Sequence, residues 1–261
     1  MSSNAEQYVI YRVLNAPLNE YPYPHLYIEN IFPFDFYQLL RENWPVANNF
    51  VSLANTGRVS SGDYKERHVI RFTPSEIEKL QNGRQAFWKE MATWFLGKNF
   101  MVSLIDKFRP QIESRLGMSI DHFSFQPDSL IVRDHSRYEI GPHTDLPHRL
   151  LSLLFYCPQD SSRAHLGTTI YTPIDKSFTC VGGPHYPFEM FEKVVTMEYK
   201  PNSLFAFLRT NNSFHGVEPI IEDEVERDLI LYNIRVAKKE GGQSDVPHRS
   251  LVERMLSGLM R

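Results

Sequence analysis

The pattern of apolar and polar positions divides the chain into a lead-in, a helical region and a region of short strands. Residues 1–32 are rich in Tyr, Pro and Asn, and they predict an extended lead-in with one short strand at Leu26–Ile28. Residues 33–117 carry apolar side chains at a spacing of three to four, which predicts helices. We expect these helices over residues 34–44, from Ser75, from Phe87 and over residues 104–116. The polar stretch 49–64 between them predicts a loop, and its length is more typical of a functional loop than of a simple connection.

After about His122 the chain consists of short runs of β-branched and aromatic residues, separated by Pro, Gly, Asn and Asp. Seven or eight such runs with turn signals between them predict a β-sandwich, barrel or jelly roll. The expected strands are residues 123–125, 130–133, 150–156, 168–171, 194–199, 203–208, 216–220 and 228–236.

No linker rich in Pro, Gly or Ser divides the chain, so we expect a single domain over residues 1–261. Within it, residues 1–120 would form a mostly helical support and residues 121–240 a β-core. Residues 241–261 would form a C-terminal helix, because residues 251–260 have a helical pattern.

Composition narrows the classes of partner. With 28 basic and 31 acidic residues the formal net charge is -3, which gives no support for binding nucleic acid or an anionic membrane. The longest apolar stretch, residues 150–157, is well under half of the ~20 residues that a membrane-spanning helix needs. The first residues lack the features of a signal peptide, and Cys157 and Cys180 are too few for a disulfide framework. We therefore expect a soluble, cytoplasmic protein without a nucleic-acid or membrane partner.

Two of the ten histidines and one aspartate have a spacing that points to a metal site. His143 and Asp145 are two residues apart, and side chains at that spacing lie on the same face of an extended backbone. Such a pair is common by chance, but His215 follows 72 residues later between two strand-like runs. Two histidines and one carboxylate form the facial triad of non-haem Fe(II) oxygenases, which leaves coordination positions open for reactants. We therefore predict that His143, Asp145 and His215 are both metal ligands and catalytic residues.

Further motifs surround these three residues in a defined order. They are Tyr138 and Gly141 ahead of His143, the strand Leu151–Tyr156, Gly167 before Thr168–Tyr171, and Pro201–Phe207 leading into Phe214–Pro219. With these motifs the chain resembles the 2-oxoglutarate- and Fe(II)-dependent dioxygenase superfamily, in its prolyl-hydroxylase-like branch. The resemblance covers residues 129–236, and Pro24–Pro33 also resembles the strand that often opens these proteins. It implies a mainly β fold with supporting helices, whose core is a double-stranded β-helix (a cupin-like jelly roll) with iron near one mouth.

The resemblance also implies 2-oxoglutarate and dioxygen as co-substrates, with ascorbate as a supporting addition. The distal carboxylate of 2-oxoglutarate needs a buried cation, and arginine binds a carboxylate through two parallel hydrogen bonds. Arg227 and Arg235 lie on the same face of one predicted strand. Arg227, 12 residues after His215, matches the family pattern and is favoured, while Arg235 stays open as the alternative.

One departure from the family concerns Leu229, where many relatives carry a hydroxyl residue that assists the arginine. That role would pass to Tyr138, Arg133 or Thr169, among which the sequence does not decide. His148 is a weaker candidate for a metal ligand, and its place after Pro147 favours a surface or substrate-facing role.

The resemblance implies an oxygenase that hydroxylates an unactivated C–H bond of a small molecule, a saccharide conjugate or a peptide side chain, with succinate and CO₂ as co-products. The carboxylate of Asp145 argues against halogenation, because halogenating relatives carry a small residue there. Residues 49–64 and 173–188 are the predicted substrate lid. The alternative is a non-catalytic, cupin-like module that binds a sugar or another small ligand. The oligomeric state is left open.

Overall fold

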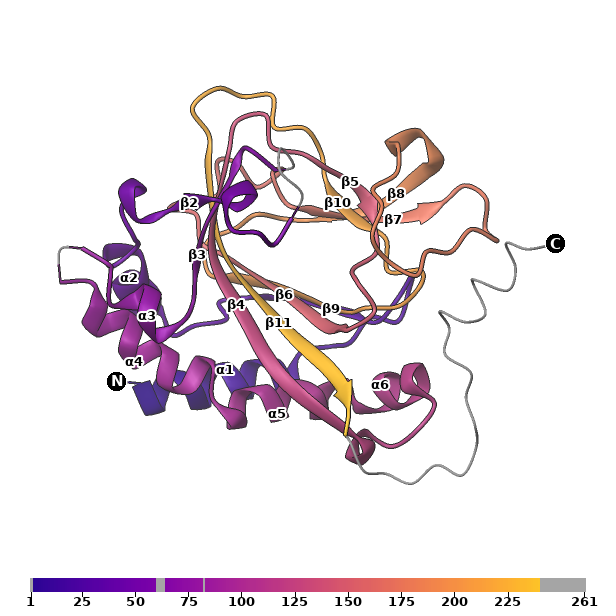
Figure 1. Ribbon diagram of the computed structural model, residues 1–261, viewed down its shortest axis with the longest axis horizontal. Helices are drawn as coiled ribbons and strands as arrows, with labels where there is room; N and C mark the ends of the chain where they lie inside the picture. The colour runs from indigo at the N-terminus through magenta and orange to yellow at the C-terminus, as the bar shows by residue number, and fades with distance from the viewer. Residues whose placement is uncertain (1, 60–63, 82, 240–261) are drawn as a thin grey trace.

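The computed structural model describes residues 2–59, 64–81 and 83–239, so the predicted C-terminal helix at 241–261 lies outside the described residues. Two antiparallel β-sheets face each other, and the helices lie on the outer side of the larger sheet (Figure 1). The α-helices are α1 (Ser2–Asn15), α2 (Phe34–Glu42), α3 (Pro74–Ile77), α4 (Gln85–Phe95), α5 (Lys98–Lys107) and α6 (Arg109–Leu116). Within the described parts of the chain, no helix is both long and apolar enough to cross a membrane.

Eight strands pair in a nested order. The first strand pairs with the last, the second with the second to last, and so on toward the middle pair. The pairs are β4 (Phe123–His135) with β11 (Glu226–Lys238), β5 (Ile140–His143) with β10 (His215–Val217), β6 (Arg149–Tyr156) with β9 (Ser203–Leu208), and β7 (Thr168–Pro173) with β8 (Phe191–Met197). This nested pairing defines a double-stranded β-helix, or jelly roll. The predicted fold class is therefore confirmed.

The two sheets differ in size. The smaller sheet has the order β5-β10-β7-β8, and the larger sheet has the order β1-β9-β6-β11-β4-β3-β2. Three strands from the first part of the chain extend the larger sheet: β1 (His25–Glu29), β2 (Val51–Ser52) and β3 (Arg67–Arg71). The strand predicted at Leu26–Ile28 is thus present as part of β1.

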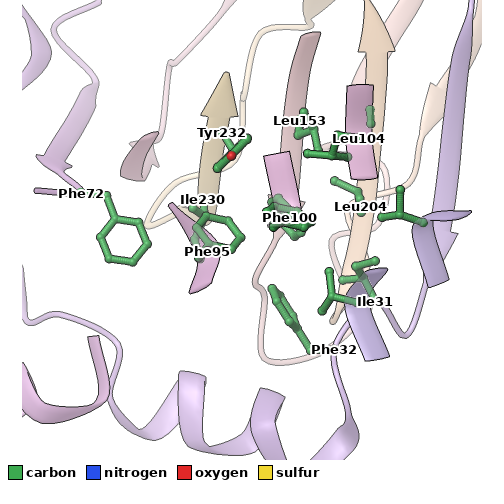
Figure 2. Close-up of a cluster of buried hydrophobic side chains, with 14 of the residues drawn as sticks. Ile31, Phe32, Phe72, Phe95, Phe100, Leu104, Leu153, Leu204, Ile230 and Tyr232 are labelled. Atoms are coloured by element: carbon green, nitrogen blue, oxygen red, sulfur yellow. The ribbon is translucent and has the colours of Figure 1, made fainter. Parts of the chain in front are cut away.

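Alternating residues of the larger sheet enter two different cores, because successive side chains of a strand point to opposite faces. On β11, Ile230, Tyr232 and Ile234 pack with the helices, whereas Leu229 and Leu231 face the smaller sheet. Figure 2 shows Phe95 and Phe100 of the helices against Ile230 and Tyr232 of the sheet. Burial of both faces explains why β6 is an almost continuous apolar run.

The lead-in differs from the prediction, because residues 2–15 form helix α1 instead of an extended segment. Ala5, Val9 and Val13 recur every four residues, and all three are buried in the core between the helices and the larger sheet. A four-residue spacing is the signature of one helix face. The high content of Tyr and Asn concealed this pattern.

The helical region also contains two departures from the prediction. Arg67–Arg71 forms strand β3, which pairs with β4, within the region that was predicted to be mainly helical. The predicted helix over residues 104–116 is two helices, α5 and α6, that meet at Phe108. The break has a local cause, since Pro110 lacks the N–H that a continuous helix would need.

Candidate functional site

A cavity of about 490 Å³ lies between the two sheets, within the usual size range of small-molecule sites. Its wall is apolar where Leu154, Phe207 and Leu231 of the larger sheet line it. Its polar lining includes three clusters, which are a group of potential metal ligands and two groups of arginines.

His143, Asp145 and His215 come together at this cavity, and all three are buried. One ligand atom from each lies within 4.8 Å of the others. His143 ends β5 and His215 begins β10, and the two residues are direct register partners with ring centroids 4.4 Å apart. Pairing of the two strands therefore sets the separation of the two imidazoles.

Backbone carbonyls orient both imidazoles. His143 Nδ1 lies 3.0 Å from the carbonyl oxygen of Gly141, and His215 Nδ1 lies 3.0 Å from that of Ser213. A carbonyl only accepts, so each Nδ1 carries the proton and each Nε2 has a free lone pair for a metal. Burial lowers the pKa of both histidines, most strongly that of His143, which keeps them in the neutral form that binds metals.

Asp145 supplies the negative charge of the cluster. Its two oxygens accept hydrogen bonds from Arg149 Nη1 at 2.5 Å and from Ser152 Oγ at 2.6 Å. Burial alone would raise the pKa of Asp145, but Arg149 and the two histidines outweigh it and hold that pKa below its usual value. Two neutral nitrogens and one ionised carboxylate are the donor set that suits Fe(II), so the residues present fit the metal that the sequence implies.

Gly216, next to His215, allows the close approach of β10 and β5. A Cβ atom at this position would lie 2.5 Å from the carbonyl oxygen of Ile140, and backbone at that distance has no room to move away. Glycine is therefore required here for steric reasons.

The first arginine group lies at the inner end of the cavity, where Arg67 and Arg227 share the carboxylate of Asp134. Arg227 is completely buried, and its Nη1 lies 2.7 Å from Asp134 Oδ2. Its Nε donates to the carbonyl of Leu166 at 2.6 Å, and its Nη2 lies 3.4 Å from Thr168 Oγ1. Arg67 binds both oxygens of Asp134, at 2.6 and 2.9 Å. We call Arg67 and Arg227 the inner arginine pair.

The residues predicted to assist Arg227 lie in different places. Tyr138 is buried in the cavity wall under the guanidinium of Arg67, and its hydroxyl has no hydrogen-bond partner among the described residues. Arg133 lies on the opposite face of β4, where it binds Asp228 at 2.8 Å. The structure thus separates Arg133 from the cavity. Thr169 also points elsewhere, since its hydroxyl bonds to Thr196, and the threonine beside Arg227 is Thr168.

The second arginine group lies at the open end of the cavity, where Arg58 and Arg235 share the carboxylate of Asp128. Arg58 binds the two oxygens of Asp128 at 3.2 and 2.5 Å, and Arg235 Nη2 lies 2.6 Å from Oδ2. Burial alone would raise the pKa of Asp128, but the two arginines outweigh it and lower that pKa. We call Arg58 and Arg235 the mouth arginine pair.

Parts of the two predicted lid segments line the same cavity. Val59 comes from the first segment and His185 from the second. The ring centroids of His185 and His143 are 4.7 Å apart. The hydroxyl of Tyr64 and Nε2 of His185 are hydrogen-bonded at 2.7 Å, which joins the two segments. His148 is exposed and lines the cavity, outside the cluster of potential metal ligands.

Sequence reasoning missed Arg58, Arg67 and Arg209. The first two lie in a segment for which the sequence predicted only a loop and helices, so no local pattern marked them. Arg209 is buried, and its guanidinium holds the backbone carbonyl of Asp145 at 2.9 Å and also that of Val181. An arginine beside Asn211 in a polar turn was the only signal for this positioning role.

No protein-family model and no curated protein sequence matches the chain. Three of the solved structures that are similar to it have low sequence identity. A prolyl-4-hydroxylase from Pseudomonas putida is 11% identical, with a TM-score of 0.46 over 88% of this chain and 98% of that one. The non-haem α-ketoglutarate-dependent epimerase SnoN from nogalamycin biosynthesis is 11% identical, with a TM-score of 0.48 over 94% and 90%. HygX from Streptomyces hygroscopicus, with nickel and 2-oxoglutarate bound, is 9% identical, with a TM-score of 0.43 over 81% and 82%.

These likenesses concern the fold alone. The nested strand pairing defines the jelly roll independently of them. The chain therefore has a double-stranded β-helix fold, with a candidate metal cluster in the cavity between its two sheets.

Proposed function

We propose that this protein is an Fe(II)- and 2-oxoglutarate-dependent oxygenase, in which one domain over residues 1–261 carries the activity. The observation that carries the proposal is the buried cluster of His143, Asp145 and His215, which provides two free imidazole nitrogens and one carboxylate at a single point of the cavity. These residues would hold Fe(II) on one side and leave its other side facing the cavity.

The inner arginine pair supports the binding of 2-oxoglutarate. Two guanidiniums share one carboxylate there, so this end of the cavity retains one positive charge for the distal carboxylate of the co-substrate. Thr168 contacts Arg227 and lies two residues from Ile170, the register partner of His215. Two residues along a strand span about 7 Å, which a five-carbon diacid can bridge.

Tyr138 adds a hydrogen-bond donor at the same end. Its buried hydroxyl has no partner among the described residues, and a buried polar group without a partner is costly. A carboxylate beside Arg67 would accept that hydrogen bond. We therefore assign Arg227, Arg67 and Tyr138 to 2-oxoglutarate, and we assign no such role to Arg133 or Arg235.

The protein's own residues hold and orient the reactants. When bound, Fe(II) with 2-oxoglutarate and dioxygen supplies the oxidising power that converts a C–H bond to C–OH, with release of succinate and CO₂. Leu154, Phe207 and Leu231 line the cavity with apolar surface, which limits the access of water to the reacting groups. We propose hydroxylation of a small molecule or a peptide side chain as the reaction.

The alternative of a non-catalytic, cupin-like module is not favoured. A structural metal site is closed by four protein ligands, whereas this cluster provides three. A module that binds a neutral sugar would have no need for the buried cation of Arg227 or for the inner arginine pair.

The test compares wild type with His143→Ala after incubation with Fe(II), ascorbate and 2-oxoglutarate. We expect wild type to bind iron and to release succinate slowly without added substrate. His143→Ala should lose both, because removal of one of three ligands weakens the site by at least the 10–100-fold that loss of a supporting residue costs. Bound iron and succinate are measured on the same samples.

His148→Ala is the matched control, since His148 lines the cavity outside the cluster and should retain the iron. If His143→Ala kept both its iron and its succinate release, the proposed function would be wrong. A 2-oxoglutarate-dependent absorption band of the anaerobic Fe(II) protein gives a second readout. Its absence in wild type, with a ligand bound elsewhere in the barrel, would favour the non-catalytic module.

A further inference from the structure

The mouth arginine pair lies at the same level of the barrel as the candidate metal ligands. Asp128, Asn233 and Ser152 are register partners across β4, β11 and β6. The hydroxyl of Ser152 donates to Asp145 at 2.6 Å, which connects this row of residues to the metal cluster. A group bound by Arg58 and Arg235 would therefore lie beside the metal, on the side of the open mouth.

The mouth arginine pair has unused binding capacity. One carboxylate, Asp128, faces the guanidiniums of Arg58 and Arg235, so a net positive charge remains. Each guanidinium has five N–H donors, and Asp128 occupies two donors of Arg58 and one of Arg235. The arginine side chains are 21% and 45% exposed, which leaves them open to a ligand from the solvent.

The charge of the whole cavity also favours an anion. Among the described residues, the lining contains four arginines and a single carboxylate; these are Arg58, Arg67, Arg149, Arg235 and Asp145. Arg227, Asp128 and Asp134 lie directly behind them, so the group has a formal charge of about two positive units although the chain carries -3. Fe(II) and doubly charged 2-oxoglutarate cancel each other, so this excess remains for a third reactant.

Asn233 provides a further polar group in this row. Its side chain is completely buried in the cavity wall, and its Oδ1 has no hydrogen-bond partner among the described residues. An acceptor of this kind is satisfied by a hydroxyl or amino group of a ligand. Leu53 and Val59 give the mouth apolar surface near the arginines.

We propose that the substrate is a small organic anion whose carboxylate or phosphate group binds Arg58 and Arg235 at the mouth of the cavity. That this anion is the substrate depends on the proposed oxygenase function, whereas its binding at the two arginines does not. The pair would fix the acidic group, and Asn233 would bind a neighbouring hydroxyl or amino group. Such an anchor would hold one C–H bond of the ligand at the metal.

The first experiment measures binding to the metal-free full-length protein by calorimetry, with phenyl phosphate, benzoate and neutral benzamide as probes. We expect at least one of the two anions to bind with a Kd of about 1 mM or lower, and benzamide to bind at least tenfold more weakly. Added NaCl should weaken the binding of the anion, because the arginines are partly exposed. Binding of benzamide as tight as that of both anions, or no anion binding below about 10 mM, would overturn the proposal.

Variants then locate the anion. Arg58→Gln and Arg235→Gln should each weaken its binding about tenfold, the loss expected for one charge-assisted hydrogen bond. Arg109→Gln, which changes an exposed arginine of α6 outside the cavity, is the matched control and should have no effect. Anion binding that survives both mouth substitutions would contradict the assigned site.

Asp128→Asn distinguishes loss of the anion site from loss of the fold. It should raise the affinity for the anion, whereas Arg58→Gln and Arg235→Gln should lower it. Without Asp128 the two guanidiniums have no counter-charge, and the anion should bind about three- to tenfold more tightly. A misfolded variant cannot gain affinity. Unchanged or weaker binding in folded Asp128→Asn would count against the proposal.

Succinate release from the Fe(II)-loaded protein distinguishes this proposal from the oxygenase proposal. The screen tests a set of acids, each paired with its neutral amide. The acids should raise the rate of succinate release above the substrate-free rate, and the amides should raise it far less. Anion binding at Arg58 and Arg235 without any consumption of 2-oxoglutarate would uphold the anion site and refute the oxygenase. Stimulation by neutral compounds alone would uphold the oxygenase and refute the anion site.

Discussion

The two ends of the cavity repeat one arrangement of charges in two different environments. At each end, one aspartate of β4 lies between an arginine of β11 and an arginine from the segment before β4. At the inner end the side chains of Asp134 and Arg227 are 0% exposed, while at the mouth Arg235 is 45% exposed. The three charged groups at the inner end are therefore shielded from water, whereas the three at the mouth can exchange their contacts with water or a ligand.

This difference in burial implies different roles for the two groups. The inner arginine pair is held by several hydrogen bonds and needs little rearrangement to bind a carboxylate. The mouth arginine pair is exposed enough to bind and release a ligand of varied shape. We therefore propose the inner end for the invariant co-substrate and the mouth for the variable substrate.

The largest expected effect distinguishes the two aspartates by stability. Asp134→Asn should lower the free energy of unfolding by about 3 kcal/mol, because it leaves two buried guanidiniums without a counter-charge. Asp128→Asn should lower it by less than about 1 kcal/mol, because its partners are partly hydrated. Urea denaturation of both variants at neutral pH measures the difference. Equal losses would show that burial does not distinguish the two ends.

The second prediction distinguishes the two ends by their affinity for 2-oxoglutarate. Arg67→Gln should weaken its binding about 10- to 100-fold, because the variant removes one charge from the inner end. Arg58→Gln should weaken it less than threefold. Calorimetric titration of the metal-loaded variants with 2-oxoglutarate gives both values. A larger effect for Arg58→Gln would reverse our assignment of the two ends.

The third prediction concerns the hydroxyl of Tyr138 and has opposite signs for stability and for binding. Tyr138→Phe removes a buried hydroxyl that has no partner, so the ligand-free protein should become more stable by up to about 1 kcal/mol. The affinity for 2-oxoglutarate should fall, because the same hydroxyl would donate to it. Thermal unfolding with and without 2-oxoglutarate measures both effects. A variant with unchanged stabilisation by 2-oxoglutarate would remove Tyr138 from the site.

The smallest expected effect is the pH dependence of the mouth. The pKa of Asp128 in the folded protein lies below its usual value of 3.8, so its ionised form stabilises the fold above that pH. This contribution is lost as the pH falls through the lowered pKa. The difference in unfolding free energy between wild type and Asp128→Asn should therefore shrink below about pH 4. A difference that grows on acidification would contradict the direction of the shift.

Patterns that are short in sequence were sufficient for most strands and for two of the three clustered residues. Alternating runs predicted most strands of the jelly roll, and the spacing of His143 and Asp145 indicated a shared face. The third member, His215, required the resemblance, because the pairing of β5 with β10 is long-range and has no local signature.

The inner end could not be predicted to the same extent. Arg67 reaches the cavity only because β3 adds to the larger sheet, and a five-residue strand in a helical region gives little signal. The open candidates to assist Arg227 included Thr169, although the threonine beside Arg227 is its neighbour Thr168, and Arg133, which lies on the face of β4 away from the cavity. One position along a strand reverses the direction of the side chain, so an error of one residue moves a side chain out of the site.

The direct pairing of His143 with His215 affects how the chain can change in length. The two histidines are separated by 72 residues of sequence but by a single step between neighbouring strands. Insertions in the surface loops of that interval, such as the exposed residues 159–162 between β6 and β7, would leave the two imidazoles in place. Deletion of one residue within β5 would instead shift the register and turn His143 away from the cavity. We therefore expect natural or engineered length variation between the two histidines to be confined to exposed loops and excluded from the strands, β5 and β10 above all.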